Sequence, residues 1–276
     1  MWSRRASLLV AVGAVALATA APAGAAPAAA EYVAMGSSFA AGPGIPSQQP
    51  GTPQVCARSD HNYASLVAGD LGLALADLSC SGATVANVLD TPQADQPPQV
   101  EAVGPETRVV TVTIGGNDVN YLGSLGTYSC LTSGGSDCGS VDQDAINRTF
   151  GELQGRLENV VHAVHDRAPE AKVVLVEYLT IVPAGDACDG VPLTGDQLTF
   201  ERSIADRLAD FTQAAGSNAG ATVVDVAGAS AGHDSCSGEP WVEKYDVAPG
   251  RTSYHPNEAG MAAVADLVKP EVAATA

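Results

Sequence analysis

The clearest element of the sequence is the segment 108–114, Arg-Val-Val-Thr-Val-Thr-Ile, which is β-branched at almost every position and is followed by Gly115-Gly116-Asn117-Asp118. Short apolar runs of this kind recur along the chain and alternate with segments of helical periodicity. The predicted strands are 32–37, 74–78, 108–114, 172–178 and 222–226. Strands that alternate with helices form right-handed βαβ units. We therefore expect an α/β fold with a parallel sheet covered by helices on both faces.

Two long amphipathic helices are the next clearest elements. In the first, apolar residues recur at spacings of three and four until Pro169 ends the pattern. These residues are Ile146, Phe150, Leu153, Leu157, Val160, Val161 and Val164. The second is expected from about Gly195 to Ala215, with Thr194 and Gln197 in the positions of a capping box. Shorter helices are expected at 62–71, just before Asp90 and from near Pro256, whereas the Gly/Ser-rich segment 121–140 is expected to be a loop.

The first 25 residues have the layout of a secretion signal peptide. Arg4 and Arg5 precede an apolar run from Leu8 to Ala20, and Ala23-Gly24-Ala25 offers a small-residue cleavage site. The run is shorter than the roughly 20 residues that span a bilayer. We therefore expect residues 1–25 to be removed on export by the Sec or the twin-arginine route, leaving no transmembrane segment in the mature protein.

The remaining chain is expected to start with a disordered Ala-rich tail at 26–30 and to form a single domain over 31–276. Loss of Arg4 and Arg5 takes the formal net charge from −18 to −20. Nucleic-acid binding needs a basic surface that replaces counterions. The charge therefore argues against a nucleic-acid partner.

Six cysteines in an exported chain predict three disulfides. They are Cys56, Cys80, Cys130, Cys138, Cys188 and Cys236. None belongs to a C-x-x-C pair, so no metal site is expected. The sequence allows 15 pairings. Pairing in chain order is the plainest, because it closes a small loop between Cys130 and Cys138 and two longer connections.

Candidate functional residues follow the ends of the predicted strands. Ser38 comes after the first, Gly82 after the second and Asn117 after the third. Ligands of parallel sheets bind at the carboxyl ends of the strands, so these residues are expected to share one rim. A serine nucleophile there needs a base and oxyanion donors.

His255 is the candidate base. It stands directly before Pro256-Asn257 at the mouth of the last predicted helix, past the fifth strand, from where it can reach Ser38. The other histidines are weaker candidates: His162 and His165 lie on the polar side or flank of a helix, and His61 and His233 lie in loops.

These residues together resemble the SGNH, or GDSL-type, hydrolase family. Its blocks of sequence are similar to Gly36-Ser37-Ser38-Phe39, to Gly82 after Cys80-Ser81, to Gly115-Gly116-Asn117-Asp118 and to His255-Pro256-Asn257 with Gly260, in family order. The cysteine spacing also resembles that of secreted actinobacterial esterases and lipases of this family. The resemblance implies a three-layer α/β/α fold with a flavodoxin-like five-stranded parallel sheet.

The resemblance also implies the role of each site residue. Ser38 is the nucleophile and His255 its base. The backbone N–H groups of Ser38 and Gly82, with the Asn117 side chain, form the oxyanion hole. Ser37 stands where the family usually has Asp, a departure expected to be mild because that side chain does not react.

A second departure concerns the group that orients His255. The family often has Asp three residues before the histidine, and Thr252 stands there. We expect a Ser–His dyad in which a backbone carbonyl near Thr252 or Ser253 holds the imidazole. A distant carboxylate such as Asp246 is the alternative.

A rival nucleophile is Ser230, because Gly228-Ala229-Ser230-Ala231-Gly232 fits the G-x-S-x-G pattern. That pattern must turn directly into a helix, and residues 233–240 do not read as one. Too little chain follows to complete an α/β-hydrolase, so Ser230 is not favoured.

The expected function is a secreted serine esterase or lipase that hydrolyses carboxylic esters of lipids or small acyl groups, and a phospholipase A-like activity is included in this expectation. It needs no cofactor, and its partner is the ester substrate. We expect a monomer. The alternatives are a carbohydrate (acetyl) esterase of the same fold and a non-catalytic exported protein that binds a glycan or lipid.

Overall fold

The computed structural model describes residues 30–275 together with Trp2. The predicted cleavage site and the tail residues 26–29 lie outside the described residues. Within them, five parallel strands form one sheet in the order β2-β1-β3-β4-β5. The strands are β1 (Tyr32–Gly36), β2 (Leu75–Asp77), β3 (Val109–Thr113), β4 (Lys172–Val176) and β5 (Thr222–Val224). This is the flavodoxin-like order, so the predicted fold class is confirmed.

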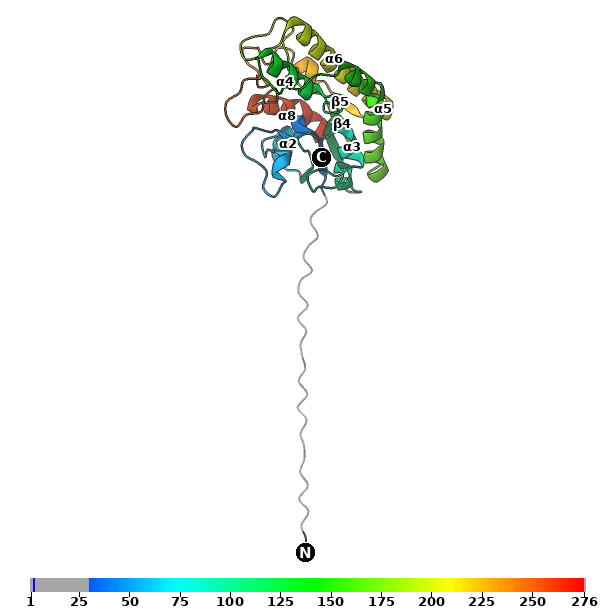
Figure 1. Ribbon diagram of the computed structural model, residues 1–276. Helices are drawn as coiled ribbons and strands as arrows, with labels where there is room; N and C mark the ends of the chain where they lie inside the picture. Colours follow the sequence, from blue (N-terminus) through cyan, green and yellow to red (C-terminus); the bar gives the residue numbers. More distant parts are fainter. Residues whose placement is uncertain (1, 3–29, 276) are drawn as a thin grey trace.

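Helices cover both faces of the sheet (Figure 1). The α-helices are α1 (Ser38–Ala41), α2 (Tyr63–Leu71), α3 (Val85–Leu89), α4 (Tyr121–Thr132), α5 (Gln143–Arg167), α6 (Gly195–Ala219), α7 (Val226–Ala229) and α8 (Glu258–Ala273), with short 3₁₀ helices η1 (Gln54–Cys56) and η2 (Gln99–Ala102). α2 packs against α8, and α5 packs against α6 and α3. Right-handed crossovers that leave β1 in opposite directions put these two groups on opposite faces.

The central strands are apolar because both of their faces are covered. β1 and β3 are buried throughout, as is usual for strands of a parallel sheet between two helical layers. All seven residues of the predicted apolar stripe on α5 are buried. The capping box of Thr194 and Gln197 also forms, with both reciprocal hydrogen bonds, at the start of α6.

The prediction of a loop over residues 121–140 is wrong for the first part of that segment. Residues 121–132 form α4, which packs against α6. Two glycines and two serines give this segment the composition of a loop. In the structure Tyr121 and Leu125 are buried, and the Ser124 hydroxyl bonds to the Tyr121 carbonyl and to Glu201. Tertiary packing therefore overrides weak local propensity.

The last helix starts two residues later than predicted. Asn257, not Pro256, borders it, and the Asn257 side chain accepts a hydrogen bond from the Gly260 N–H at 2.9 Å. Pro256 instead pairs with Val242 in an isolated antiparallel bridge. Similarly, β5 ends at Val224 because Asp225 caps α7.

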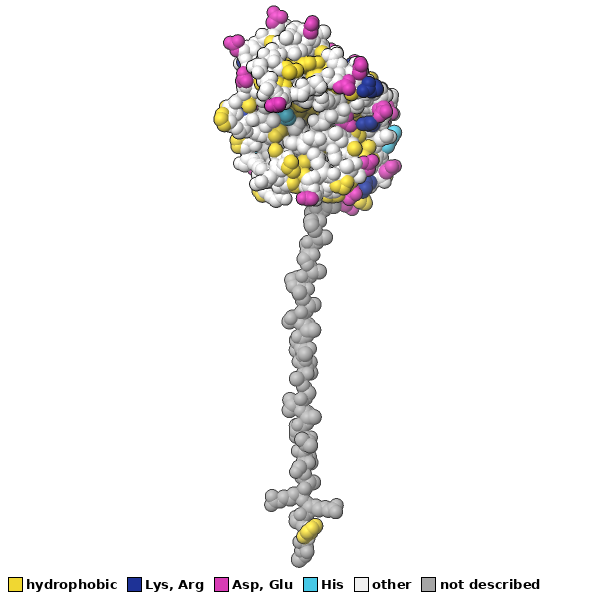
Figure 2. Space-filling view, in the orientation of Figure 1, with side chains coloured by type: hydrophobic (Ala, Val, Ile, Leu, Met, Phe, Trp, Pro, Cys, Tyr) yellow, Lys and Arg dark blue, Asp and Glu magenta, His cyan; other side chains and the backbone are white. Residues whose placement is uncertain are grey.

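The face of the molecule shown in Figure 2 carries more acidic than basic side chains, in keeping with the net charge of −18. None of the helices formed by the described residues is long and apolar enough to cross a membrane.

Three disulfides join the cysteines in chain order: Cys56 to Cys80, Cys130 to Cys138 and Cys188 to Cys236. The last connects the segment after β4 with the segment after β5, across a sequence separation of 48 residues. The second closes a separation of only 8 residues beyond α4. The constraint that each bond places on the unfolded chain therefore differs.

Replacing Cys188 and Cys236 together by serine is expected to lower the free energy of unfolding by about 4 kcal/mol, because loop-closure entropy grows with the size of the loop. The same change at Cys130 and Cys138 is the matched control and is expected to cost about 2.5 kcal/mol. Urea denaturation measures both. The reverse order of the two losses would contradict this account.

Candidate active site

The turn from β1 into α1 presents Ser38. Gly36 ends the strand with φ +140, and a Cβ at this position would lie 2.3 Å from the Thr113 carbonyl oxygen on β3. The next residue, Ser37, donates its backbone N–H to the same carbonyl at 2.9 Å. The chain then bends directly into α1, so that Ser38 is the first helical residue. Its N–H has no intrahelical acceptor, as is general for a first helical residue.

Gln99 holds this turn from the other side. β2 pairs with β1 only as far as Ala34, so Gly36 has no strand partner there. The Gln99 side chain fills the gap: its Oε1 accepts from the Gly36 N–H at 2.6 Å, and its Nε2 donates to the Gly36 carbonyl at 3.0 Å. A buried amide thereby continues the hydrogen-bond pattern of the sheet up to the turn that carries Ser38.

The structure brings His255 onto Ser38. His255 Nε2 lies 2.8 Å from Ser38 Oγ, although 217 residues separate them in sequence. The ring follows Tyr254, whose backbone is left-handed with φ 59, and it precedes the Asn257 cap of α8. Ser38 is only 5% exposed. The pair therefore has the spacing that a serine nucleophile and its base require.

The second imidazole nitrogen bonds to the backbone. His255 Nδ1 lies 2.8 Å from the Ser253 carbonyl oxygen, whereas the Thr252 carbonyl accepts from the backbone N–H of His255 at 3.2 Å. A carbonyl can only accept, so Nδ1 carries the proton and Nε2 is free to accept from Ser38. Within the described residues, no hydrogen bond or ion pair joins Asp246 to His255.

Burial lowers the pKa of His255 below its ordinary value, and the hydrogen bond to Ser253 opposes this shift. The neutral imidazole is therefore the favoured form at neutral pH, as a general base requires.

The Gly82 turn lies beside the turn that carries Ser38. Cys80 donates its N–H to the Gly36 carbonyl at 3.0 Å, and Ser81 donates its N–H to the Cys56 carbonyl at 3.1 Å. Gly82 itself has φ +81, a conformation that favours glycine. Its N–H donates to no protein acceptor in the part of the chain that the structure describes. It is thus available to an oxyanion.

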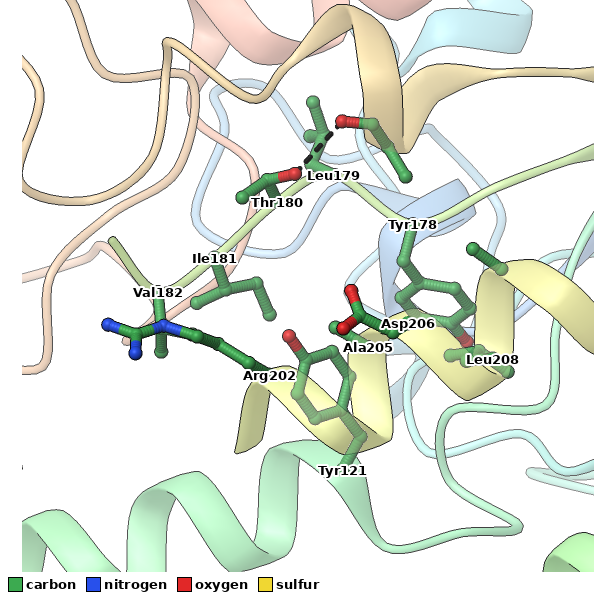
Figure 3. A pocket seen from close by; sticks show the side chains of 12 residues that line it. Tyr121, Tyr178, Leu179, Thr180, Ile181, Val182, Arg202, Ala205, Asp206 and Leu208 are labelled. Atoms are coloured by element: carbon green, nitrogen blue, oxygen red, sulfur yellow. Dashed lines mark hydrogen bonds between the residues drawn. The ribbon is translucent and has the colours of Figure 1, made fainter. Parts of the chain in front are cut away.

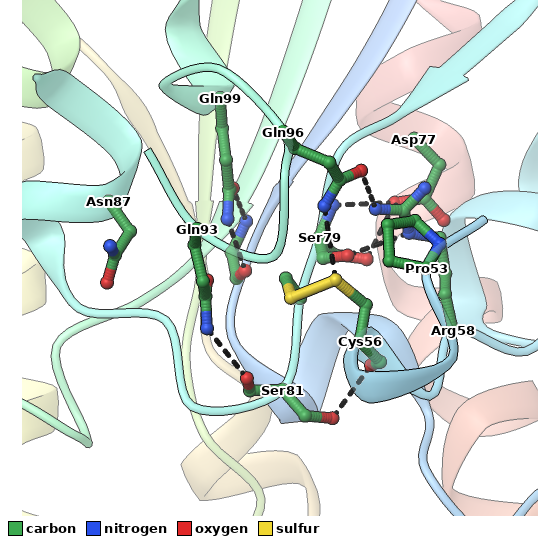
Figure 4. Close-up of a disulfide and its surroundings, with 12 residues drawn as sticks. Pro53, Cys56, Arg58, Asp77, Ser79, Ser81, Asn87, Gln93, Gln96 and Gln99 are labelled. Atoms are coloured by element: carbon green, nitrogen blue, oxygen red, sulfur yellow. Dashed lines mark hydrogen bonds and ion pairs between the residues drawn. A yellow bond between two sulfur atoms is a disulfide. The ribbon is translucent and has the colours of Figure 1, made fainter. Parts of the chain in front are cut away.

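A buried ion pair supports the loop that leads to Gly82 (Figure 4). Arg58 donates from Nε to the Ser79 carbonyl at 2.7 Å and lies 3.6 Å from Asp77 Oδ1. That carboxylate also accepts from the backbone N–H and the hydroxyl of Ser79. Burial lowers the pKa of Arg58, and the negative charge of Asp77 opposes this. The disulfide from Cys56 to Cys80 ties the same loop.

Asn117 reaches the Gly82 turn from β3. Its Nδ2 donates to the Ala83 carbonyl at 2.8 Å. A side-chain amide carries two N–H groups, so one remains for a ligand. The neighbouring Asp118 accepts from the Val85 N–H at 3.0 Å and lies 3.5 Å from Arg156. Desolvation raises the pKa of Asp118, and these contacts oppose the rise. Asp118 thereby anchors the Asn117 turn to α3 and α5.

Ser230 and the other histidines lie outside this arrangement. The Ser230 hydroxyl is buried, donates to the Val226 carbonyl at 2.7 Å and accepts from the Thr180 N–H at 2.8 Å. His233 stacks on Trp241 with ring centroids 4.0 Å apart. His162 is exposed on α5.

Sequence reasoning missed Gln99, the Arg58–Asp77 pair and the partner of Ser37, which is the Tyr178 hydroxyl at 2.9 Å. A glutamine in a Pro/Gln-rich stretch carries no signal of this kind. The one sequence signal for Tyr178 is its position at the end of the predicted strand 172–178, which places it at the same edge of the sheet as Ser38.

Comparisons with known proteins identify the family of this chain. The model of the GDSL-like lipase/acylhydrolase family matches residues 34–263. Lipase 2 of Streptomyces coelicolor is 35% identical over 245 residues, which cover 83% of this chain and 81% of that protein. A lipase of Streptomyces rimosus is 32% identical over 264 residues, covering 94% of each.

Solved structures show the same similarity. The crystal structure of phospholipase A1 from Streptomyces albidoflavus NA297 matches with a TM-score of 0.72 and 28% identity, over 90% of this chain and 100% of that one. The extracellular lipase from Streptomyces rimosus matches with a TM-score of 0.72, 29% identity and the same coverage. The resemblance seen in the sequence is confirmed, and the chain belongs to the GDSL-like lipase/acylhydrolase family.

Proposed function

We propose that this family member is a secreted serine esterase that hydrolyses carboxylic ester bonds of lipids or small acyl esters. The observation that carries the proposal is the 2.8 Å contact between Ser38 Oγ and His255 Nε2. The free N–H of Gly82 and the second N–H of Asn117 give it the donors that acyl transfer requires.

In the proposed acylation step, His255 Nε2 takes the Ser38 proton while Ser38 Oγ attacks the carbonyl carbon of the ester. The negative charge that forms on the carbonyl oxygen is held by the N–H groups of Ser38, Gly82 and Asn117. The imidazolium then returns its proton to the departing alcohol oxygen, and the acyl group stays on Ser38.

Deacylation repeats the same proton transfers with water. His255 takes a proton from the water molecule, the resulting hydroxide attacks the acyl carbon, and the proton goes back to Ser38 Oγ as the acid leaves.

Ser38 and His255 are proposed to work as a dyad, without a carboxylate as third member. Throughout both steps the proton stays on His255 Nδ1, which donates it in a hydrogen bond to the Ser253 carbonyl oxygen 2.8 Å away. A neutral carbonyl fixes the tautomer and the ring orientation as a carboxylate does, but it stabilises the imidazolium less. The dyad therefore combines an oriented base with a low pKa, which favours the neutral form that starts the reaction.

The proposed substrate class has its support in the relatives. Those of 31–35% identity are named lipases, and one solved structure is a phospholipase A1. These names favour acyl esters of lipids over acetylated polysaccharide. The acetylxylan esterase among the solved structures is 15% identical, a similarity that reflects the fold alone.

Export and a monomeric state are part of the proposal. Three disulfides favour an oxidising compartment. Among residues 30–275, the large hydrophobic side chains that are exposed are Val55 and Leu131. Such scattered residues do not form the apolar patch of a stable dimer.

Replacing Ser38 by Ala is expected to lower the hydrolysis of short p-nitrophenyl esters and of a diacyl phospholipid at least about a thousandfold, because the attacking oxygen is gone. Thermal unfolding and circular dichroism should match the native protein. A serine-directed organophosphonate should label native Ser38 and not Ser230, as read by peptide mass spectrometry. Retained hydrolysis in the variant, or label on Ser230, would refute the assignment, and absence of any labelling would favour a non-catalytic binding protein.

Replacing Asn117 by Ala is expected to lower kcat by about a hundredfold to a thousandfold and to change KM little, because this donor acts on charge that develops in the transition state. Asn147 is the matched control: it lies on α5 and accepts a hydrogen bond from Arg207, away from the rim. Steady-state kinetics of the two Ala variants should differ by about that factor. Equal kcat values would remove Asn117 from the oxyanion hole.

Activity is expected to fall as the pH drops through the pKa of His255, because the protonated ring cannot accept from Ser38. Burial lowers that pKa below the ordinary value of 6.5, so the acid limb of kcat/KM should have its midpoint below pH 6.5. Asp246→Asn should leave the midpoint unchanged. A downward shift of the midpoint, or collapse of activity, in this variant would reveal a hidden triad.

A further inference from the structure

Tyr178 follows β4 and reaches across the carboxyl ends of β3 and β1. Its hydroxyl accepts a hydrogen bond from the Gly116 N–H at 3.0 Å and lies 2.9 Å from Ser37 Oγ. Because the Gly116 N–H can only donate, the tyrosyl oxygen accepts there, and its own proton is free for Ser37 Oγ. One buried hydroxyl thus joins two turns that come from different strands.

Each partner of this hydroxyl stands next to a reacting group. Ser37 directly precedes Ser38, and Gly116 directly precedes Asn117. The tyrosine ring adds a third contact, since its centroid lies 4.7 Å from that of Phe39. Tyr178 therefore contacts the residues on both sides of Ser38 and the residue before Asn117.

Tyr178 packs closely against Gly116 on one side and borders a cavity on another. A Cβ on Gly116 would lie 2.8 Å from three atoms of Tyr178, so the close approach needs glycine at that position. Elsewhere the ring borders a cavity of about 90 Å³, which Tyr121 and Leu208 also line (Figure 3). Packing is incomplete on the side of the cavity. On that side no side chain of the described residues fills the space, so the two hydrogen bonds help to hold the hydroxyl in place.

We propose that Tyr178 is a positioning residue that keeps the Ser38 oxygen and the Asn117 amide aligned with each other. This inference rests on the proposed function, because it takes these two groups as nucleophile and oxyanion donor. The hydroxyl does not touch the reacting atoms and acts through the backbone of the two turns.

The serine at position 37 fits this role. In the described part of the chain, its hydroxyl bonds only to Tyr178, and it makes no cap to α1. Ser37 is 1% exposed, and a carboxylate here would be a buried charge beside a neutral hydroxyl. The hydroxyls of Ser37 and Tyr178 join the two turns by a hydrogen bond without burying a charge.

Tyr178→Phe removes the hydroxyl and keeps the ring. We expect kcat for a soluble p-nitrophenyl ester to fall by about tenfold to a hundredfold, with KM changed by less than about twofold, because the reacting groups lose their alignment.

Tyr32→Phe is the matched control. The Tyr32 hydroxyl is also buried and pairs with Thr111 Oγ1 at 2.9 Å, but it lies at the amino end of β1. Tyr178→Phe loses two hydrogen bonds and Tyr32→Phe loses one, so thermal unfolding should report a loss of stability in both variants, larger in Tyr178→Phe, whereas only Tyr178→Phe should lower kcat.

Ser37→Ala completes a double-mutant cycle. It should lower kcat on its own, and the double variant should be no slower than Tyr178→Phe, since Tyr178→Phe already removes the hydrogen bond that Ser37→Ala removes. Where Tyr178→Phe does not fold, undiminished kcat in Ser37→Ala overturns the inference.

Equal kcat values in Tyr178→Phe and Tyr32→Phe, with Ser38→Ala inactive, overturn the role of Tyr178 and leave the proposed function intact. Full activity of Ser38→Ala overturns both.

Discussion

The turn between β1 and α1 is the constraint on which the rest of the site depends. Gly36 presses against the Thr113 carbonyl so closely that no Cβ fits, and the chain bends from a buried strand straight into a helix. Several parts of the rim contact this turn directly: Gln99 and Cys80 bond to Gly36, and His255 Nε2 lies within hydrogen-bond distance of Ser38 Oγ. The parallel sheet makes this possible because its strands end at one edge.

Support for the proposed reaction comes largely from neutral groups. The imidazole is oriented by a carbonyl, and the available oxyanion donors are two backbone N–H groups and an amide. The buried ion pair of Arg58 and Asp77 lies one step further away, beneath the Gly82 turn. Neutral dipoles held in place by the fold can stabilise a charge that appears only during reaction, without burying a permanent one.

Much of the fold could be predicted because its signals are local. The β-branched run of β3 and the apolar stripe of α5 are patterns that a short window of sequence is enough to show. Both elements form as expected. The sequence did not predict α4, because the contacts that stabilise it, such as the hydrogen bond from Ser124 to Glu201 on α6, come from a distant part of the chain. The family motifs named Ser38 and His255, but Gln99 and Tyr178 act on residues 63 and 141 positions away, and no local pattern marks such contacts.

The contact between His255 and the Ser253 carbonyl also bears on how the site can change through mutation. A carboxylate that orients a histidine can be lost by a single codon change, whereas a main-chain carbonyl is present whatever residue stands at position 253. The orientation of the imidazole then depends on the conformation of the backbone around position 253. Tyr254 has a left-handed φ of 59, and its hydroxyl lies 2.6 Å from Ser129 Oγ on α4. The orientation of His255 therefore depends on the backbone conformation of this loop and not on one acidic side chain.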